Sequence, residues 1–335
     1  MNAILSIIVP VYNRPEEIQE LLESLVEQDF KESYEIVIVE DGSTKSSEEV
    51  VKSFQESLQI SYYFKENTGP GDSRNYGMQN AKGNYYIILD SDCILPKQYL
   101  SEVKKELQTD FVHCFGGPDA AHESFTTVQK AINYVMTSFF TTGGIRGGGK
   151  SVGKFQPRSF NMGISKEAFS KAGGFGQIHP GEDPDLTFRI WKAGYATRLF
   201  PKAFVYHKRR IDWNKFYIQV NKFGMVRPIL NKWHKGTAKL TYWFPTLFIL
   251  GLFASVLMAL GGIILPLAIV IAYFLLLFLD ASIKNKSIKV ALLAIFAALT
   301  QFTGYGIGFL KSTILVNFSK KEPETLFPKL FFKKK

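Results

Sequence analysis

The stretch from Leu5 to Asp41, LSIIVPVYNRPEEIQELLESLVEQDFKESYEIVIVED, runs from one apolar segment through a segment of helical spacing to a second apolar segment. Two further apolar runs, ISYYFKE at 60–66 and GNYYIILD at 83–90, also end in polar residues. Runs rich in β-branched and aromatic residues predict strands, and strands that alternate with helices form a parallel sheet. The sequence therefore predicts an α/β domain built on a mostly parallel sheet.

The composition is that of a folded protein with excess positive charge. Of 335 residues, 46% are hydrophobic and 21% are charged, which excludes the disordered and fibrous classes. The 40 lysines and arginines exceed the 30 acids, a balance that suits nucleic acid, anionic lipid or a phosphorylated substrate. Two cysteines, Cys93 and Cys114, are too few for a disulfide scaffold and favour a reducing compartment. The first apolar run ends at Pro10 with no basic segment before it, so we expect a strand in the cytosol rather than a signal peptide.

Apolar residues become nearly continuous after about residue 240. The ranges 242–260 and 261–279 carry no charge and approach the roughly 20 residues that a helix needs to cross a bilayer. They predict a transmembrane helical hairpin. A third range, 290–310, is also long enough, but Thr300, Gln301 and several glycines interrupt it, so the pattern leaves two or three crossings open.

Basic residues flank these apolar ranges. Eleven lysines and arginines between Arg198 and Lys239 accompany a single acid, Asp212, and by the positive-inside rule this side is cytoplasmic. The lysine-rich loop at 284–289 would be cytoplasmic after two crossings. A third crossing would place the basic C-terminal residues outside, so we favour the hairpin.

Between Trp213 and Trp233, aromatic and aliphatic residues recur every three or four positions, with basic residues between them. A basic amphipathic helix directly before a membrane span suits the lipid surface, although an ordinary core-facing helix is the alternative. No nucleic-acid-binding motif accompanies the charge, so we expect membrane lipids and no nucleic acid as partners. The predicted division is an N-terminal domain at 1–210, an interfacial helix region at 211–239, a transmembrane region at 240–318 and a basic tail at 319–335.

The strongest local motif is YYIILDSDC at 85–93, where Asp90, Ser91 and Asp92 leave the end of an apolar run. Two carboxylates one residue apart can share a hard divalent cation with a diphosphate, although acids are also common in turns and helix caps. Ligands of parallel sheets bind beyond the carboxyl ends of the strands. Polar residues that follow the other predicted strands at this edge are Tyr12, Asn13, Glu40 and Asp41.

A second acidic cluster lies in HPGEDPDLTFRIWKAGY at 179–195. Glu182, Asp183 and Asp185 precede a helix, where acids are often caps. Three carboxylates within four positions also repel one another, which raises the proton affinity of one of them, as a general base needs. His207 follows the apolar run FPKAFVY. A lone histidine is more often structural, but at a strand end near two aspartates it fits a metal shell.

A glycine-rich segment, GGIRGGGKS at 143–151, fits the phosphate-binding pattern G-x-x-x-x-G-K-S through Gly144, Gly149, Lys150 and Ser151. Alone it would indicate an ATPase. A P-loop needs a strand before it and a helix after it, and the following SVGKFQPRSF is poor helix material. We therefore favour a glycine loop near the site.

Four segments together resemble family 2 glycosyltransferases. They are SIIVPVYNR, IVIVEDGST, NTGPGDSRNYGMQNAKGNYYIILDSD and NMGISKEAFSKAGGFGQIHPGEDPDLTFRIWKAGY, and they follow the family's order over about residues 4–210. The resemblance implies a Rossmann-like GT-A fold, a UDP- or GDP-sugar donor, a Mg²⁺ or Mn²⁺ ion and inversion at the anomeric carbon. The C-terminal YGIGFLK resembles membrane-attached members that build exopolysaccharide or lipid-linked oligosaccharide. This implies a lipid-linked or polysaccharide acceptor and a multi-pass enzyme of the inner cell membrane, with its catalytic domain in the cytoplasm.

The resemblance also implies roles for single positions. Those that match the family's nucleotide-sugar site are Pro10, Tyr12, Asn13, Glu40, Asp41, Arg74, Asn75, Asp90, Ser91 and Asp92. Those that match its metal site are Asp92, Asp90 and His207. Glu40 stands where the family often has an aspartate, which leaves uracil or guanine open as the base. Asp183, beside Glu182, matches the base of the E-D motif. Trp213, a candidate on the acceptor side, only echoes the Q-x-x-R-W of processive members, so polymerisation is not supported.

These matches predict an inverting, metal-dependent transfer. Asp183 would remove a proton from an acceptor hydroxyl while that oxygen displaces the diphosphate, and the metal would neutralise charge on the leaving group. The nearest alternative is a polyprenyl-phosphate glycosyltransferase, whose phosphate acceptor needs less help from a base. A membrane-bound P-loop ATPase that depends on Lys150 and a non-catalytic membrane scaffold are the remaining alternatives.

Overall fold

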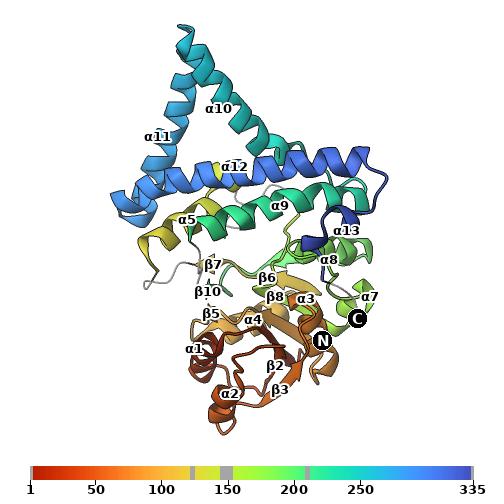
Figure 1. Ribbon diagram of the computed structural model, residues 1–335. Helices are drawn as coiled ribbons and strands as arrows, with labels where there is room; N and C mark the ends of the chain where they lie inside the picture. The colour runs from red at the N-terminus through yellow and green to blue at the C-terminus, as the bar shows by residue number, and fades with distance from the viewer. Residues whose placement is uncertain (1–2, 121–124, 144–153, 208–211, 333–335) are drawn as a thin grey trace. The chain divides into compact units, whose positions relative to one another are not determined.

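The computed structural model describes residues 3–120, 125–143, 154–207 and 212–332 (Figure 1). The chain forms two compact units. Unit 1 comprises Met1–His122, Ile145–Lys208 and Phe331–Lys335, and unit 2 comprises Glu123–Gly144 and Arg209–Leu330. Unit 2 thus takes a short segment from the N-terminal half, and unit 1 takes the last residues of the chain.

Unit 1 is built on a mixed, mostly parallel sheet whose strand order, over the described residues, is β3-β2-β1-β4-β8-β6-β9. The strands are β1 (Leu5–Val11), β2 (Glu35–Asp41), β3 (Ile60–Lys65), β4 (Tyr85–Leu89), β6 (Cys114–Gly116), β8 (Asn161–Ser165) and β9 (Thr197–Leu199). β1 pairs in parallel with both β2 and β4, and β2 with β3, whereas β8 runs antiparallel to β4 and β6. The expected α/β fold and its four apolar strands are confirmed.

Helices cover both faces of this sheet because the central strands are apolar on both sides. Leu5, Ile7 and Val9 of β1 pack with the helices on one face, and Ile8 packs with those on the other. The first face carries α1 (Pro15–Val26), α2 (Glu48–Phe54) and α4 (Tyr99–Thr109). The second face carries α3 (Pro70–Asn80), α7 (Lys166–Ala172) and α8 (Glu182–Lys192). Each fully buried Leu or Ile contributes about 1.5–3 kcal/mol, so this double covering fixes the register of the strands.

A small second sheet in unit 1 joins two distant parts of the chain. Its strands are β5 (Cys93–Ile94), β7 (Asp119–Ala120) and β10 (Val205–His207), in the order β5-β10-β7. His207 is the partner of Cys93 in the antiparallel pair of β10 with β5. This pairing carries His207 to the end of β4, where the aspartates lie.

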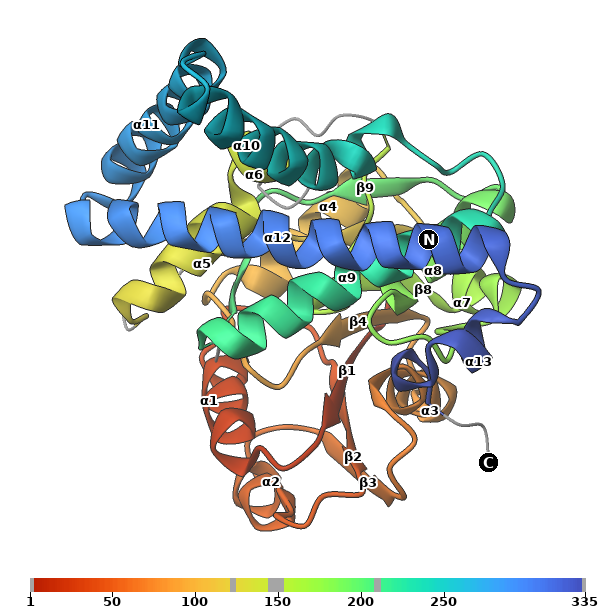
Figure 2. The same ribbon diagram turned by 45° about the horizontal axis from the view of Figure 1, so that its top comes forward.

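Unit 2 is helical over its described residues. Its elements are α5 (Thr127–Thr137), α6 (Phe139–Thr142), α9 (Trp213–Trp233), η1 (Leu240–Trp243), α10 (Phe244–Leu260), α11 (Leu265–Asn285), α12 (Ile288–Phe318), α13 (Pro323–Leu326) and η2 (Pro328–Leu330). α9 begins after Asp212, whose carboxylate accepts a hydrogen bond from the backbone N–H of Lys215 at 2.8 Å. α10 and α11 form a hairpin, and α9 runs along α12 in both views (Figures 1 and 2).

Glycines allow α9 and α12 to approach closely. A Cβ atom at Gly224 of α9 would lie 2.2 Å from the carbonyl oxygen of Tyr305, and one at Gly304 of α12 would lie 2.6 Å from Val220. Asn221 of α9 donates a hydrogen bond to the carbonyl of Gly304 at 2.9 Å. Small residues that let two helix backbones touch are common between helices that pack inside membranes.

Among the described residues, three helical segments are long and apolar enough to cross a membrane: Leu240–Leu260, Leu265–Asn285 and Ile288–Phe318. The first two correspond to the predicted hairpin. Only 11% of the most apolar window of each is buried, against 44% for the third. The hairpin is therefore exposed apolar surface on nearly every side, whereas α12 has one side covered by α5, α9 and its other neighbours.

Candidate functional site

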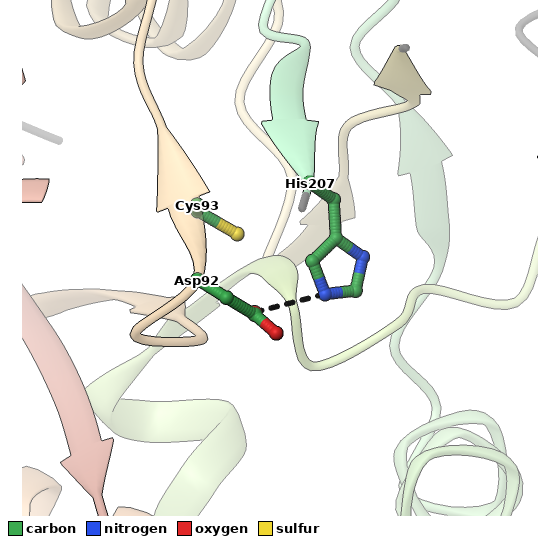
Figure 3. A group of neighbouring side chains, drawn as sticks. All are labelled: Asp92, Cys93 and His207. Carbon is green, nitrogen blue, oxygen red and sulfur yellow. Dashed lines mark ion pairs between the residues drawn. The ribbon is translucent and has the colours of Figure 1, made fainter. Parts of the chain in front are cut away.

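Asp92 and His207 face each other at the end of β4 (Figure 3). Nε2 of His207 lies 3.0 Å from Oδ1 of Asp92, and Nη1 of Arg14 lies 3.0 Å from Oδ2. Burial alone would raise the pKa of Asp92, but His207 and then Arg14 stabilise the carboxylate and lower its pKa to about 2. The Phe160 ring stacks on His207 at 4.9 Å between centroids. Asp92 is therefore ionised in a fixed position.

This pair fits a divalent cation. In an octahedral ion with ligand distances of about 2.1 Å, neighbouring ligand atoms lie about 3 Å apart, and the Asp92 and His207 atoms lie 3.0 Å apart. A carboxylate oxygen with an imidazole nitrogen suits Mn²⁺, and the oxygen suits Mg²⁺. Cys93 lies in the same group, but its Sγ donates to the carbonyl of Phe160 at 3.4 Å. Burial, and then the charge of Asp92, raise the pKa of this thiol far above its usual value, so Cys93 stays a neutral thiol.

Arg74 of α3 connects the end of β4 with the beginning of α8. Its side chain is buried, with Nη2 at 2.8 Å from Oδ1 of Asp90 and Nη1 at 3.3 Å from Oε1 of Glu182. Glu182 also lies 2.8 Å from Nδ1 of His179. Burial would raise the pKa of Glu182, but His179 and Arg74 lower it to about 2. One guanidinium thus holds together the two acidic motifs, which are about 90 residues apart in the sequence.

Asp183, the next residue of α8, has the opposite electrostatic character. Burial, and then the neighbouring charge of Glu182, raise the pKa of Asp183, while Arg74, Arg158 and Ser159 act in the other direction. Its Oδ1 atom is buried and has no hydrogen-bond partner among the described residues. A carboxylate with raised proton affinity and a vacant acceptor position is suited to take a proton from a bound hydroxyl.

Asp41 is the last residue of β2 and lies at the same edge of the sheet. It accepts hydrogen bonds from the backbone N–H groups of Thr68 at 3.0 Å and Gly69 at 2.9 Å, and from Nζ of Lys65 at 2.6 Å. These contacts tie the end of β2 to the beginning of α3. Asp41 therefore shapes this loop, with its charge balanced by Lys65.

The other predicted residues at this edge have local partners. The wholly buried Glu40 accepts hydrogen bonds from the Ser47 backbone at 2.9 Å and the Tyr62 hydroxyl at 3.1 Å. Asn13, with a positive φ of 55°, accepts hydrogen bonds from the backbone N–H groups of Thr44 and Lys45. These side chains join the loops after β1 and β2. Tyr12 is half exposed, which leaves its ring free to contact a ligand.

The remaining residues predicted from the sequence are Asn75, Pro10, Ser91, Trp213 and the P-loop candidate. Asn75 exchanges two hydrogen bonds with the backbone of Phe175, at 2.9 and 2.7 Å, and so holds the loop before α8. Pro10 and Ser91 are buried beside the site. Trp213 lies in unit 2, with its ring against Phe296 at 4.7 Å. The P-loop candidate, Gly144, Gly149, Lys150 and Ser151, lies outside the described residues.

Three residues in this network were not assigned a role from the sequence. Arg14 follows Asn13 in the quoted SIIVPVYNR, and His179 begins the acidic segment HPGEDPD, so each had a positional signal. Arg158 had none, since it follows the glycine-rich segment in a stretch without periodicity. All three act on carboxylates that the sequence did identify.

The fold of unit 1 is of the GT-A type. A solved structure with the same fold is the mannosyltransferase PcManGT from Pyrobaculum calidifontis in complex with GDP-Man and Mn²⁺. The similarity has a TM-score of 0.56 at 20% identity and covers 96% of this chain and 89% of that one. Residues 6–171 match the family model described as Glycosyl transferase family 2. Over residues 6–171 the chain therefore carries a family 2 glycosyltransferase domain, as its motifs predict.

Curated relatives match part of the chain. An uncharacterized glycosyltransferase from Rickettsia felis is 35% identical over 138 residues, which are 41% of this chain and 22% of the relative. The GalNAc(5)-diNAcBac-PP-undecaprenol beta-1,3-glucosyltransferase of Campylobacter jejuni is 32% identical over 115 residues, 33% of this chain and 37% of the relative. The match therefore spans less than half the length of each relative.

Proposed function

We propose that this protein transfers a sugar from a UDP- or GDP-sugar to a hydroxyl group of a membrane-associated, lipid-linked acceptor, with inversion at the anomeric carbon and with a divalent metal. The observation that carries this proposal is the Arg74 bridge between Asp90 and Glu182. This bridge supports a single pocket that contains both groups of acids. In this pocket the strand-end aspartates would face the leaving diphosphate, and the acids of α8 would face the acceptor.

Asp183 is the proposed general base. Its raised pKa and its unpartnered Oδ1 favour acceptance of a proton from the acceptor hydroxyl as that oxygen attacks the anomeric carbon. The C–O bond to the acceptor forms while the bond to the diphosphate breaks on the opposite face, which inverts the configuration. Base catalysis of this kind contributes about 10²–10⁴-fold to the rate.

Asp92 and His207 would hold the metal, with Asp90 nearby. When bound, a divalent cation neutralises charge that develops on a leaving diphosphate. Arg14, at 3.0 Å from Asp92, is a further cation at this end of the site. Asp41 and the exposed ring of Tyr12 form the side proposed for the nucleoside. These assignments separate leaving-group stabilisation from proton removal.

The acceptor is proposed as a lipid-linked sugar rather than a lipid phosphate. Apolar helices that could cross a membrane support a membrane-associated acceptor, and the name of the Campylobacter jejuni relative describes an undecaprenol-linked acceptor for that protein. A polyprenyl phosphate is ionised near neutral pH and needs no base. The raised pKa of Asp183 favours the hydroxyl acceptor over this alternative.

The path of the chain supports two membrane crossings. Unit 1 ends at Lys208 before the apolar helices and is resumed at Phe331 after them. Because a compact unit lies on one side of a membrane, the number of crossings between these points is even. Of the three candidate helices, the two least covered by protein form the hairpin of α10 and α11. We propose that this hairpin spans the inner membrane and that unit 1 lies in the cytoplasm.

α12 would then lie along the membrane surface. One side packs on α9, which is too charged to span, and on α5, which belongs to a segment of 22 residues, Glu123–Gly144, that is too short to cross a bilayer twice. The other side exposes Leu292, Ile307 and Ile314, a lipid-facing stripe. At 31 residues, α12 is about 46 Å long, longer than the hydrocarbon core of about 30 Å.

Replacement of Asp183 by Asn tests the proposed chemistry. Transfer should fall by about 10²–10⁴-fold, while the dissociation constant of the donor should change less than about threefold. Asp185→Asn is the matched control, since Asp185 lies on the same helix and is paired with Arg189 at 2.6 Å. Turnover that survives in Asp183→Asn with a lipid-phosphate acceptor would support the polyprenyl-phosphate alternative, and turnover that survives with a hydroxyl acceptor would refute the base.

A further inference from the structure

The last described residues of the chain, Phe331 and Phe332, are part of unit 1 and lie next to the loop that precedes α8. Phe331 forms an antiparallel bridge with Ile178, and the backbone N–H of Phe332 donates to the carbonyl of Gln177 at 3.1 Å. Ile178 is buried. These backbone contacts attach the C-terminal segment to residues that are more than 150 positions earlier in the sequence.

The Phe332 ring contacts two sides of the candidate site. A Cβ atom at Gly69 would lie 2.4 Å from Cδ2 of Phe332, so the ring occupies the space that any side chain at position 69 would need. The ring centroid also lies 5.9 Å from that of His179. Gly69 donates its N–H to Asp41, and His179 pairs with Glu182. One aromatic ring therefore lies between Gly69, which binds Asp41, and His179, which binds Glu182.

We propose that Phe332 is a positioning residue that sets the spacing between the Asp41 loop and the Glu182–Asp183 turn. The inference rests on the function proposed above, because it assigns these two loops to donor and acceptor. Phe332 does not touch the reacting atoms; it acts through Gly69 and His179. Displacement of a catalytic group by about 1 Å costs on the order of 10²-fold in rate. Loss of the Phe332 ring should therefore have a large kinetic effect.

Phe332 is also connected through the chain to the apolar helices. Phe332 follows α12 by a short segment that contains α13 and η2. The residue that holds the two loops apart is therefore covalently continuous with the apolar helices. Detachment of the C-terminal segment would relax the site while the Asp92–His207 pair keeps its own contacts.

The test compares Phe332→Ala, Phe332→Leu and Phe332→Tyr in the full chain, with Lys329→Ala as the matched control from the same segment. Lys329 is exposed. The first readout is amide hydrogen exchange of residues 177–183 without substrate. Exchange should accelerate about tenfold or more in the Ala and Leu variants and stay unchanged in the Tyr variant and the control.

The second readout separates binding from turnover. In Phe332→Ala, kcat should fall about 10–100-fold while the dissociation constant of the donor stays within about threefold, and Phe332→Tyr should restore kcat to within about threefold. Unchanged exchange at 177–183 in the Ala and Leu variants overturns the inference even if no sugar is transferred, and so does accelerated exchange with a normal kcat. Absence of transfer by the unaltered chain would instead count against the proposed function.

Discussion

Replacement of Glu182 by Gln should remove much of the sensitivity of unit 1 to acid. The pKa of Glu182 is about 2 in the folded unit, against an ordinary value of 4.5, because His179 and Arg74 overcome the effect of burial. At 1.36 kcal/mol for each pKa unit, the difference between 4.5 and 2 corresponds to about 3 kcal/mol of folding free energy. Since the folded pKa is the lower one, this stabilisation is complete above about pH 5 and is lost as the pH falls toward 2.

Melting curves of the full chain in detergent measure this effect. For a domain of about 200 residues, 1 kcal/mol shifts Tm by about 2–4 °C, so the unaltered chain should lose up to about 6–12 °C more than Glu182→Gln as the pH falls from 6 to 2. At pH 7 the variant should melt lower, because Arg74 has lost a buried partner, and the curves should converge in acid. Glu56→Gln, at an exposed position, should follow the unaltered chain. Parallel curves for Glu182→Gln and the unaltered chain would refute the reasoning.

Two further predictions concern the metal and the membrane. Asp92→Asn should weaken Mn²⁺-dependent donor binding about tenfold or more, because it removes a charged ligand from the pair with His207; calorimetry with and without Mn²⁺ checks this, and an unchanged metal requirement would contradict it. Because Cys93 and Cys114 are buried, a cysteine placed at Gly262 or Ser319 can be labelled by an impermeant maleimide. Labels should reach these two positions from opposite faces of the membrane, and labelling of both from one face would contradict two crossings.

The central sheet was predictable because its signal is local. The runs that become β1, β2, β3 and β4 are each apolar over most of their length, and they alternate with helices. β9, with three residues, and β5, with two, are too short to show a period of two. Their positions follow from pairing with distant strands. The packing of α5 with the C-terminal helices was equally unpredictable from the sequence. It includes a hydrogen bond of 2.6 Å from the Tyr134 hydroxyl to Asp280, which is 146 residues away.

The site was predictable in its acids but not in its cations. The motif at Asp90–Asp92 follows a predicted strand, and the motif at Glu182–Asp183 precedes a predicted helix. The sequence alone therefore suggests where each motif lies. That Arg74 bridges them depends on how α3 packs on β1 and β2, which no local pattern encodes. Asn75, next to it, shows the same limit, because it binds the backbone of Phe175, a contact that the sequence does not suggest.

The assignment of the base follows from a difference between two adjacent carboxylates. From the sequence, Glu182 and Asp183 are nearly equal candidates for the general base, since both lie at the beginning of the same helix. Arg74 and His179 contact Glu182 and lower its pKa to about 2, which leaves a permanent negative charge that accepts no proton near neutral pH. That same charge, after burial, raises the pKa of Asp183. Environments that push two neighbouring pKa values apart mark different roles for the two acids, so we propose that Glu182 holds the framework and that its charge prepares Asp183 to take the proton.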